Sequence, residues 1–166
     1  LAGEPLEELE ELLLEMINEI RAWNGVAPLE MHPDLRQVAR EHAQLMNDEY
    51  CYYKFQGCNC TGWVPDCSSR DTHQAPSEPS VSDRLLALGF SRIAENVSWS
   101  FNSLAPIKGA AEGWDNSCLA GTGMEHREHQ LGASIHVGIG IARSERTYID
   151  GYTGQYYTFT CDYGAL

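Results

Sequence analysis

The feature that most constrains the fold is a change in hydrophobic period along the chain. Near the C-terminus, the segments ASIHVGIGIA and GYTGQYYTFTCD show the alternation and the β-branched and aromatic content typical of strands. The segment RSER separates the first of them from Thr147, and this short connection predicts an antiparallel β-ladder. We therefore expect a small antiparallel sheet in the last part of the chain.

The first part of the chain repeats apolar residues at helical spacing instead. LEELEELLLEMINEI predicts an amphipathic helix that ends near WNGVAP, and MHPDLRQVAREHAQLMNDEY predicts a second helix with Pro33 in its first turn. SVSDRLLALGF and SLAPIKGAAEGWDNS predict two further helices, whereas SRIAENVSW is extended or irregular. Helices followed by strands indicate the α+β class. The 166 residues are enough for one domain, 1–166, which includes an N-terminal extension at 1–5.

Charge and hydropathy restrict the partners. The chain has 24 acidic and 11 basic residues, a formal net charge of −13, which would repel a phosphate backbone. We therefore expect no nucleic-acid partner. No apolar stretch approaches the ~20 residues of a membrane-spanning helix, so the protein is not expected to be transmembrane. No signal peptide is visible, and the chain starts at Leu1.

Six cysteines indicate disulfide bonds and an oxidising compartment. Four of them lie in residues 51–79, a segment rich in Cys, Gly, Ser and Pro that we predict to be a long ordered loop held by disulfides. Structural zinc is the alternative, but the spacing of these four cysteines does not form the two close pairs of common zinc motifs.

The pairing inside this loop stays open at the sequence level. Two sets of pairs are Cys51–Cys60 with Cys58–Cys67, and the nested Cys51–Cys67 with Cys58–Cys60, which needs a strained ring. The predicted long-range bridge is Cys118–Cys161, which would tie the loop after the fourth helix to the last strand.

Titratable side chains gather in or next to the irregular segments, where functional residues are common. They are Asp71, His73, Glu95, Glu112, Asp115, Glu125, His126, Glu128 and His129. On one helical turn His126 and His129 would share a face and could hold one ion. Their HREH spacing nevertheless differs from the zinc-protease motif, which places two histidines at i and i+4.

The other three histidines have different expected roles. His42 lies on the apolar stripe of the second helix, so we predict a hydrogen-bonded core histidine. His32 precedes Pro33 and is expected at the start of that helix, while the role of His136 in the first strand is open.

The order of these motifs resembles the CAP superfamily, also called the SCP domain, which includes cysteine-rich secretory proteins, antigen 5 and pathogenesis-related-1 proteins. The likeness is greatest to its bacterial and archaeal branch. It runs through MINEIRAWNGVAPLEMHPDLRQVAREHAQLM, DTHQAPSEPSVSDRLLALGF, AENVSW and WDNSCLAGTGMEHREHQLGASIHVGIGIA, from about Met16 to Cys161. The resemblance implies a three-layer α–β–α sandwich around the antiparallel sheet.

The resemblance also implies a site. The two histidines of the family's central cleft fall on His73 and His126, and the glutamate of its Gly-Glu-Asn-Ile box falls on Glu95. In many members these histidines bind a divalent metal, often Zn²⁺, and Glu95 is the candidate catalytic residue. His129 stands where the family usually has Asn. The family's second glutamate is not matched after Trp114, and an insertion, CLAGTGME, separates Ser117 from His126.

The function that follows is a secreted, extracellular or cell-surface binding module with a metal-binding cleft and an unidentified extracellular ligand. A metal-dependent hydrolase of peptides or esters and a carrier of small lipids or sterols are the alternatives. Fold alone does not choose among them.

Overall fold

A computed structural model describes residues 5–52, 54–59, 61–63, 72–101 and 124–166, with the backbone alone at 101 and 124–127. The predicted helix over SLAPIKGAAEGWDNS falls outside the described residues. The elements are α1 (Leu6–Trp23), β1 (Glu30–Met31), α2 (Pro33–Glu49), β2 (Tyr50–Cys51), β3 (Gly62–Trp63), α3 (Val81–Leu86), β4 (Arg92–Phe101), α5 (Met124–Leu131), β5 (His136–Thr147) and β6 (Thr153–Ala165).

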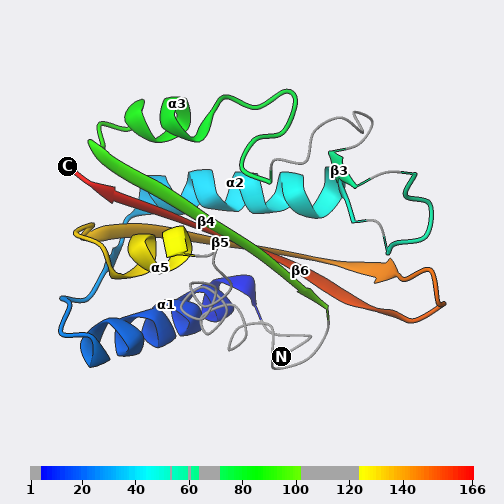
Figure 1. The fold of residues 1–166 in the computed structure, drawn as a ribbon, viewed down its shortest axis with the longest axis horizontal. Helices are drawn as coiled ribbons and strands as arrows, with labels where there is room; N and C mark the ends of the chain where they lie inside the picture. Colours follow the sequence, from blue (N-terminus) through cyan, green and yellow to red (C-terminus); the bar gives the residue numbers. More distant parts are fainter. Residues whose placement is uncertain (1–4, 53, 60, 64–71, 102–123) are drawn as a thin grey trace.

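The main sheet has the strand order β1-β5-β6-β4. β6 pairs antiparallel with both β5 and β4, and the two-residue strand β1 adds a parallel edge beside β5. Figure 1 shows α2 and α3 on one side of the sheet and α1 and α5 on the other. The predicted three-layer α–β–α sandwich around a small antiparallel sheet is therefore confirmed.

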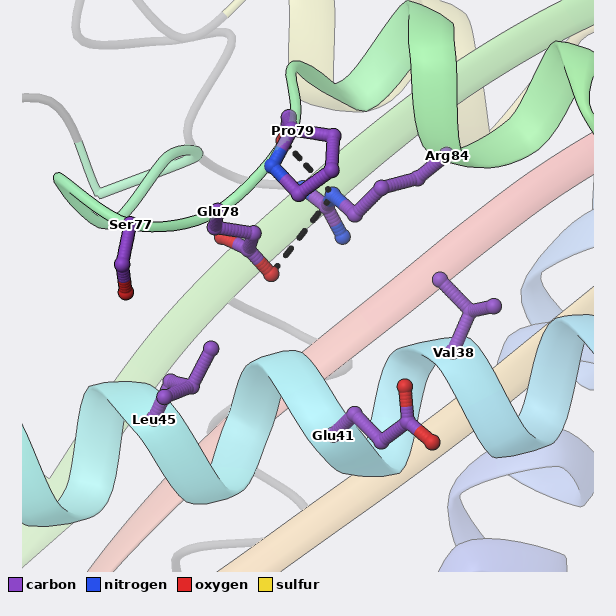
Figure 2. A pocket seen from close by; sticks show the side chains of 7 residues that line it. All are labelled: Val38, Glu41, Leu45, Ser77, Glu78, Pro79 and Arg84. Carbon is purple, nitrogen blue, oxygen red and sulfur yellow. Dashed lines mark hydrogen bonds and ion pairs between the residues drawn. The ribbon is translucent and has the colours of Figure 1, made fainter.

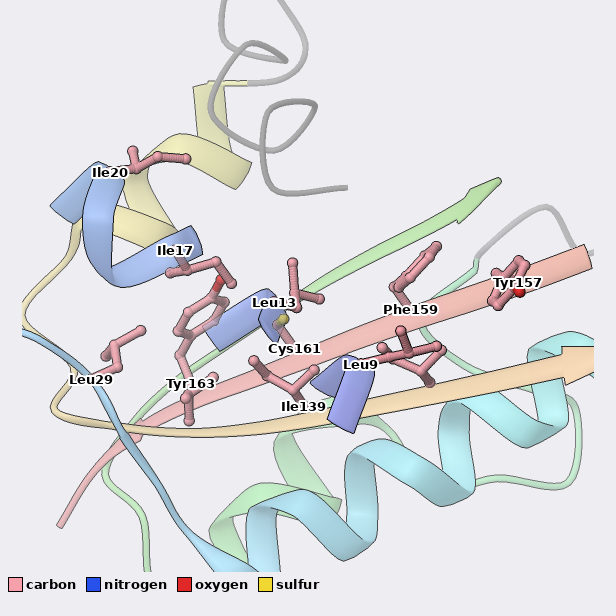
Figure 3. Close-up of a cluster of buried hydrophobic side chains, with 12 residues drawn as sticks. Leu9, Leu13, Ile17, Ile20, Leu29, Ile139, Tyr157, Phe159, Cys161 and Tyr163 are labelled. Carbon is pink, nitrogen blue, oxygen red and sulfur yellow. The ribbon is translucent and has the colours of Figure 1, made fainter. Parts of the chain in front are cut away.

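The face toward α1 carries the main apolar core. Because side chains alternate across a strand, the odd-numbered residues of β5 and β6 point to this face. These strand residues pack against apolar residues of α1, which recur at helical spacing. Together they form one buried cluster, shown in Figure 3. The cluster contains Leu9, Leu13, Ile17, Ile20, Leu29, Val137, Ile139, Ile141, Tyr157, Phe159, Cys161 and Tyr163.

The face toward α2 is built differently. Here β5 presents Gly138 and Gly140, and a Cβ atom at either position would overlap the backbone of α2, at Leu35 or at Ala39 and Arg40. The alternation of VGIGI thus has two structural reasons: apolar residues meet α1, and glycines let α2 lie directly on the sheet. Buried polar residues of β6, including Thr158 and Asp162, face the same layer.

Most element boundaries agree with the sequence. His32 caps α2 by accepting a hydrogen bond from the Asp34 N–H, as its predicted place at the helix start implies. The third helix ends at Leu86, and a turn leads to Gly89 at φ 90°. The RSER segment was expected to connect the strands, but β5 continues through it to Thr147, because its pairing with β6 extends to Thr153.

The pairing of the cysteines differs from the prediction. Cys51 bonds to Cys58, not to Cys60 or Cys67, because turns after Tyr52 bring the two Cα atoms to 5.6 Å. Cys161 is a free cysteine, so the predicted bridge Cys118–Cys161 is wrong. Its side chain points into the α1 core with no exposed surface, where it packs as a small apolar group. Cys60, Cys67 and Cys118 lie outside the described residues.

Candidate functional site

The site begins at the contact between His73 and Glu95. His73 lies in the segment before α3, and its Nδ1 is 2.9 Å from Oε1 of Glu95 on β4. The His73 side chain is 35% exposed, whereas the Glu95 side chain is 1% exposed. A buried carboxylate thus holds the ring of a solvent-accessible histidine, and the Nδ1–H tautomer that donates to it has its lone pair on Nε2.

Glu95 is held as an anion despite its burial. Burial alone would raise its pKa, but the hydrogen bond with His73, the neighbouring carboxyl group of Asp162 and the electrostatic effects of His42 and Arg84 outweigh that cost and lower the pKa to about 2. Arg84 Nη1 lies 3.2 Å from Glu95 Oε2. Glu95 is therefore ionised throughout the physiological pH range.

Asp162 is a second carboxyl group beside Glu95. The two residues are direct partners in the register of β4 and β6, and Asp162 is fully buried on the same face of the sheet. Burial raises the pKa of Asp162 well above its usual range, and the negative charge of Glu95 raises it further. Asp162 was not among the site residues predicted from the sequence.

The third buried residue of the site is His42 on α2, which has no exposed surface. Its Nδ1 is 2.9 Å from Glu78 Oε2, and its Nε2 is 2.7 Å from the carbonyl oxygen of Thr72. Both ring nitrogens therefore have hydrogen-bond partners within the protein, which confirms the predicted core histidine. These bonds fix the Thr72–Glu78 segment, which carries His73, against α2.

Arg84 on α3 connects the His73–Glu95 pair with the His42–Glu78 pair. It donates from Nη2 to the carbonyl oxygen of His73 at 2.8 Å, and its Nε lies 3.6 Å from Glu78 Oε1. Figure 2 shows Arg84 and Glu78 at the wall of a pocket of about 340 Å³ between α2 and the segment before α3. The pocket is lined by Val38, Glu41, Leu45, Ser77, Glu78, Pro79 and Arg84.

The histidine-rich segment of the sequence forms α5, on the other side of the sheet. His129 Nδ1 is 2.9 Å from Oδ1 of Asn96, the residue after Glu95. Because neighbouring residues on a strand point to opposite faces, His129 and His73 contact β4 from opposite sides. The structure therefore does not bring His129 together with His73, and the side chain of His126 lies outside the described residues.

The position of α5 depends on a buried arginine of α1. Arg21 is 1% exposed and donates to the carbonyl oxygens of Ala27 at 2.7 Å, Gln130 at 2.6 Å and Gly132 at 3.2 Å. Two of these carbonyls belong to the end of α5 and the turn that follows. A cation at a helix C-terminus satisfies carbonyl groups that have no partner within the helix.

The structure thus joins two of the predicted site residues and adds others. His73 and Glu95, two of the site residues that the resemblance implies, are in contact. The buried network is completed by four residues for which no role in the site was predicted: Asp162, Arg84, His42 and Glu78. One signal was available for Asp162: it is the acidic residue in the otherwise uncharged segment YYTFTCDYG, at a position that alternation places inside.

The remaining histidines lie near the start of α2. The ring centroids of His32 and His136 are 5.3 Å apart, and both rings contact Phe90 edge-on. In the described parts of the chain, no three His, Cys, Asp or Glu side chains are grouped closely enough to hold a metal ion.

The layered fold and the His–Glu pair define a class of protein, an α–β–α sandwich with a polar site at an edge strand. A family model for the cysteine-rich secretory protein family, CAP, matches residues 14–163. The chain belongs to this family. A search of curated proteins finds no match to it.

Solved structures show the same fold at low sequence identity. An outer surface protein from Borrelia burgdorferi is 16% identical, with a TM-score of 0.61 over 97% of this chain and 95% of that one. An extracellular protein containing an SCP domain from Bacillus anthracis is 18% identical, with a TM-score of 0.62 over 96% of this chain. A cysteine-rich secretory protein from Staphylococcus aureus is 18% identical, with a TM-score of 0.56 over 98%. This chain spans 41% of each of the last two proteins.

None of the described helices is long and apolar enough to cross a membrane.

Proposed function

We propose that this protein is a secreted CAP domain that binds an extracellular ligand at a cleft containing His73 and His126, with a divalent metal such as Zn²⁺ held by these histidines. The observation that carries the proposal is the 2.9 Å contact between His73 Nδ1 and the buried Glu95. A metal-ligating histidine typically donates its other ring N–H to a carboxylate, which fixes the tautomer.

The described residues fit one half of such a site. His73 would ligate through Nε2, and Glu95 would orient the ring without being a ligand. His126 is the second proposed ligand. Its helix, α5, packs beside β4, the strand that carries Glu95. When bound, the ion would supply open coordination positions for an electron-pair donor of the ligand.

An extracellular location has two supports. Cys51 and Cys58 form a disulfide, which is typical of proteins from oxidising compartments. The similar structures include proteins described as extracellular or outer-surface proteins.

Binding is favoured over hydrolysis by the state of Glu95. A general base works best with a pKa near the operating pH, whereas the pKa of Glu95 is lowered to about 2. Its carboxylate is also engaged by His73 and Arg84. Glu95 therefore fits the role of an orienting group better than that of a proton acceptor.

A lipid carrier is not favoured by the pocket beside the network. Two carboxylates and a guanidinium line its volume of about 340 Å³, and an alkyl chain there would remove water from charged groups.

Zinc titration by calorimetry on metal-free protein without a histidine tag tests the proposal. We expect one site, with affinity reduced at least about tenfold in His73→Ala and in His126→Ala, a loss of about 1.4 kcal/mol. His129→Ala, in the same helix as His126, is the matched control and should bind like the parent. Affinity should also fall below about pH 6, because protonated imidazole is not a ligand.

No binding by the parent protein, or undiminished binding by both His73→Ala and His126→Ala, would defeat the proposal. A loss of binding in His129→Ala alone would move the metal to the Asn96 side of the sheet.

A further inference from the structure

We infer that Asp162 is a positioning residue: it carries a proton at neutral pH and donates a hydrogen bond to Glu95, which in turn holds the ring of His73. The inference concerns the metal-free protein and goes beyond the proposed function.

The first support is the place of Asp162 in the sheet. It lies directly opposite Glu95 in the β4–β6 register, and both side chains face the layer of α2 and α3. On its other side, β5 presents Gly138, which has no side chain to reach the carboxyl group. Glu95 is thus the neighbouring side chain in the sheet that can meet Asp162.

The second support is the lack of hydrogen-bond donors near the two carboxyl groups. Within the described residues, no N–H or hydroxyl group donates to either oxygen of Asp162, and Glu95 Oε2 likewise lacks an aligned donor. Polar atoms buried without a partner are costly. A proton on one carboxyl group removes part of that cost, because the protonated group then donates to the other.

The third support is the distribution of charge, which decides where the proton resides. Glu95 receives the His73 N–H and lies 3.2 Å from Arg84 Nη1, and both contacts favour its ionised form. Among the ion pairs of the described residues, none includes Asp162. Two adjacent buried carboxyl groups seldom ionise together, so the proton belongs to Asp162.

The charged and titratable groups around the pair agree with this assignment. Arg84 of α3 and His42 of α2 face Glu95, and Glu78 of the segment before α3 adds negative charge near Asp162. Glu78 has its own contacts with His42 and Arg84. Burial and the negative charge of Glu95 both raise the pKa of Asp162, which agrees with a proton on this residue.

The consequence is a chain of hydrogen bonds that begins at the buried Asp162 and fixes the ring of the solvent-accessible His73. The Asp162 O–H donates to Glu95, Glu95 accepts the Nδ1–H of His73, and the lone pair of the ring is fixed on Nε2. Asp162→Asn should preserve this arrangement, because an amide N–H can replace the carboxylic O–H. Asp162→Ala should remove it.

The test uses metal-free parent protein, Asp162→Asn, Asp162→Ala and the control Thr160→Val. Thr160 is also buried, on the same strand and face as Asp162, and its hydroxyl has no hydrogen-bond partner within the described residues. Infrared spectroscopy detects a protonated carboxyl group by its C=O stretch, and long-range proton–nitrogen NMR reports the tautomer of His73.

We expect a protonated-carboxyl band at neutral pH in the parent and in Thr160→Val that is absent in Asp162→Asn. His73 should keep its Nδ1–H tautomer in Asp162→Asn and shift toward a mixture of tautomers in Asp162→Ala. A missing band in the parent, a band that persists in Asp162→Asn, or an unchanged His73 tautomer in a folded Asp162→Ala would each overturn the inference. If Asp162→Ala does not fold, the infrared comparison decides alone.

Discussion

Glu95 and Asp162 lie side by side, yet the protein shifts their pKa values in opposite directions. Burial acts against ionisation of both, but Glu95 has His73 and Arg84 within 3.2 Å, which compensates its charge. Asp162 has the charge of Glu95 as its neighbour, which adds to the effect of burial. One buried acid is thereby an anion and the other a hydrogen-bond donor.

This difference predicts how stability depends on pH. The pKa of Asp162 is raised above its ordinary value of 3.8, so the folded protein retains a proton that the unfolded chain has lost. The contribution of this group to stability is present below about pH 3.8 and is lost as the pH rises toward its pKa in the folded state. Over this range the free energy of unfolding falls by at most ~1.4 kcal/mol per pH unit because of Asp162.

Asp162→Asn should remove this slope, so the free energy of unfolding of the variant, relative to the parent, should rise with pH above about 4. Urea unfolding of both proteins over a pH series measures the difference. Thr160→Val is the control and should differ from the parent by a constant amount. A difference between Asp162→Asn and the parent that does not vary with pH would refute the assignment of the proton to Asp162.

The sequence allowed one half of this site to be predicted and not the other. His73 and Glu95 stand in motifs that resemble a known family, and the resemblance named both as site residues. Arg84 lies in a helix, where a charged residue looks like an ordinary solvated position, and the inward position of Asp162 in its strand does not by itself identify its neighbour. Their role depends on the register of β4 with β6, which a single sequence does not specify.

At the scale of elements, α5 is held at its end by Arg21 of α1. The guanidinium donates to Gln130 across 109 positions of sequence. Periodicity predicted that α1 forms a helix with an apolar face, and this is confirmed. It could not indicate that a basic residue near the end of α1 points inward, because its acceptors are backbone carbonyls, which carry no sequence signal.

We expect Arg21→Met to loosen α5 selectively. The change removes the donors to four buried or partly buried carbonyl groups and should lower the free energy of unfolding by about 3 kcal/mol. Hydrogen exchange monitored by mass spectrometry should show faster exchange in α5, while α2, packed on the glycines of β5, remains protected.

Arg92→Met, at an exposed position on β4, is the control for this experiment and should exchange like the parent. Equal acceleration in α2 and α5 of Arg21→Met would mean that Arg21 stabilises the whole domain without a special role for α5.

On the scale of the whole molecule, the sheet is covered by helices on both faces, and the α1 side is the larger apolar core. The two faces follow from alternation in β5 and β6, which was visible in the sequence. The disulfides were predicted less well. Cysteines in an acidic chain were expected to be paired, but Cys161 alternates with Phe159 and Tyr163 on the face toward α1, and its environment is apolar.

Cys161 is therefore a probe of global unfolding. It is fully buried, and burial raises the pKa of its thiol well above the usual range, so the reactive thiolate is disfavoured. We predict that a thiol reagent modifies Cys161 at the same rate as the slowest hydrogen exchange of β6. Peptide mapping, with Cys161→Ser as the control, identifies the product. Rapid modification under native conditions would contradict the packing of β6 against α1.

The proposed function requires that His73 and His126 hold one metal ion while Glu95 orients His73. A crystal grown with zinc and measured on both sides of the zinc absorption edge tests it most directly, because the anomalous signal locates the ion independently of any other assay. We predict one strong anomalous peak within coordination distance of His73 Nε2 and a ring nitrogen of His126, with Glu95 still bonded to His73 Nδ1. A peak at His129, or at His32 and His136, with none at His73, would contradict the proposed metal site.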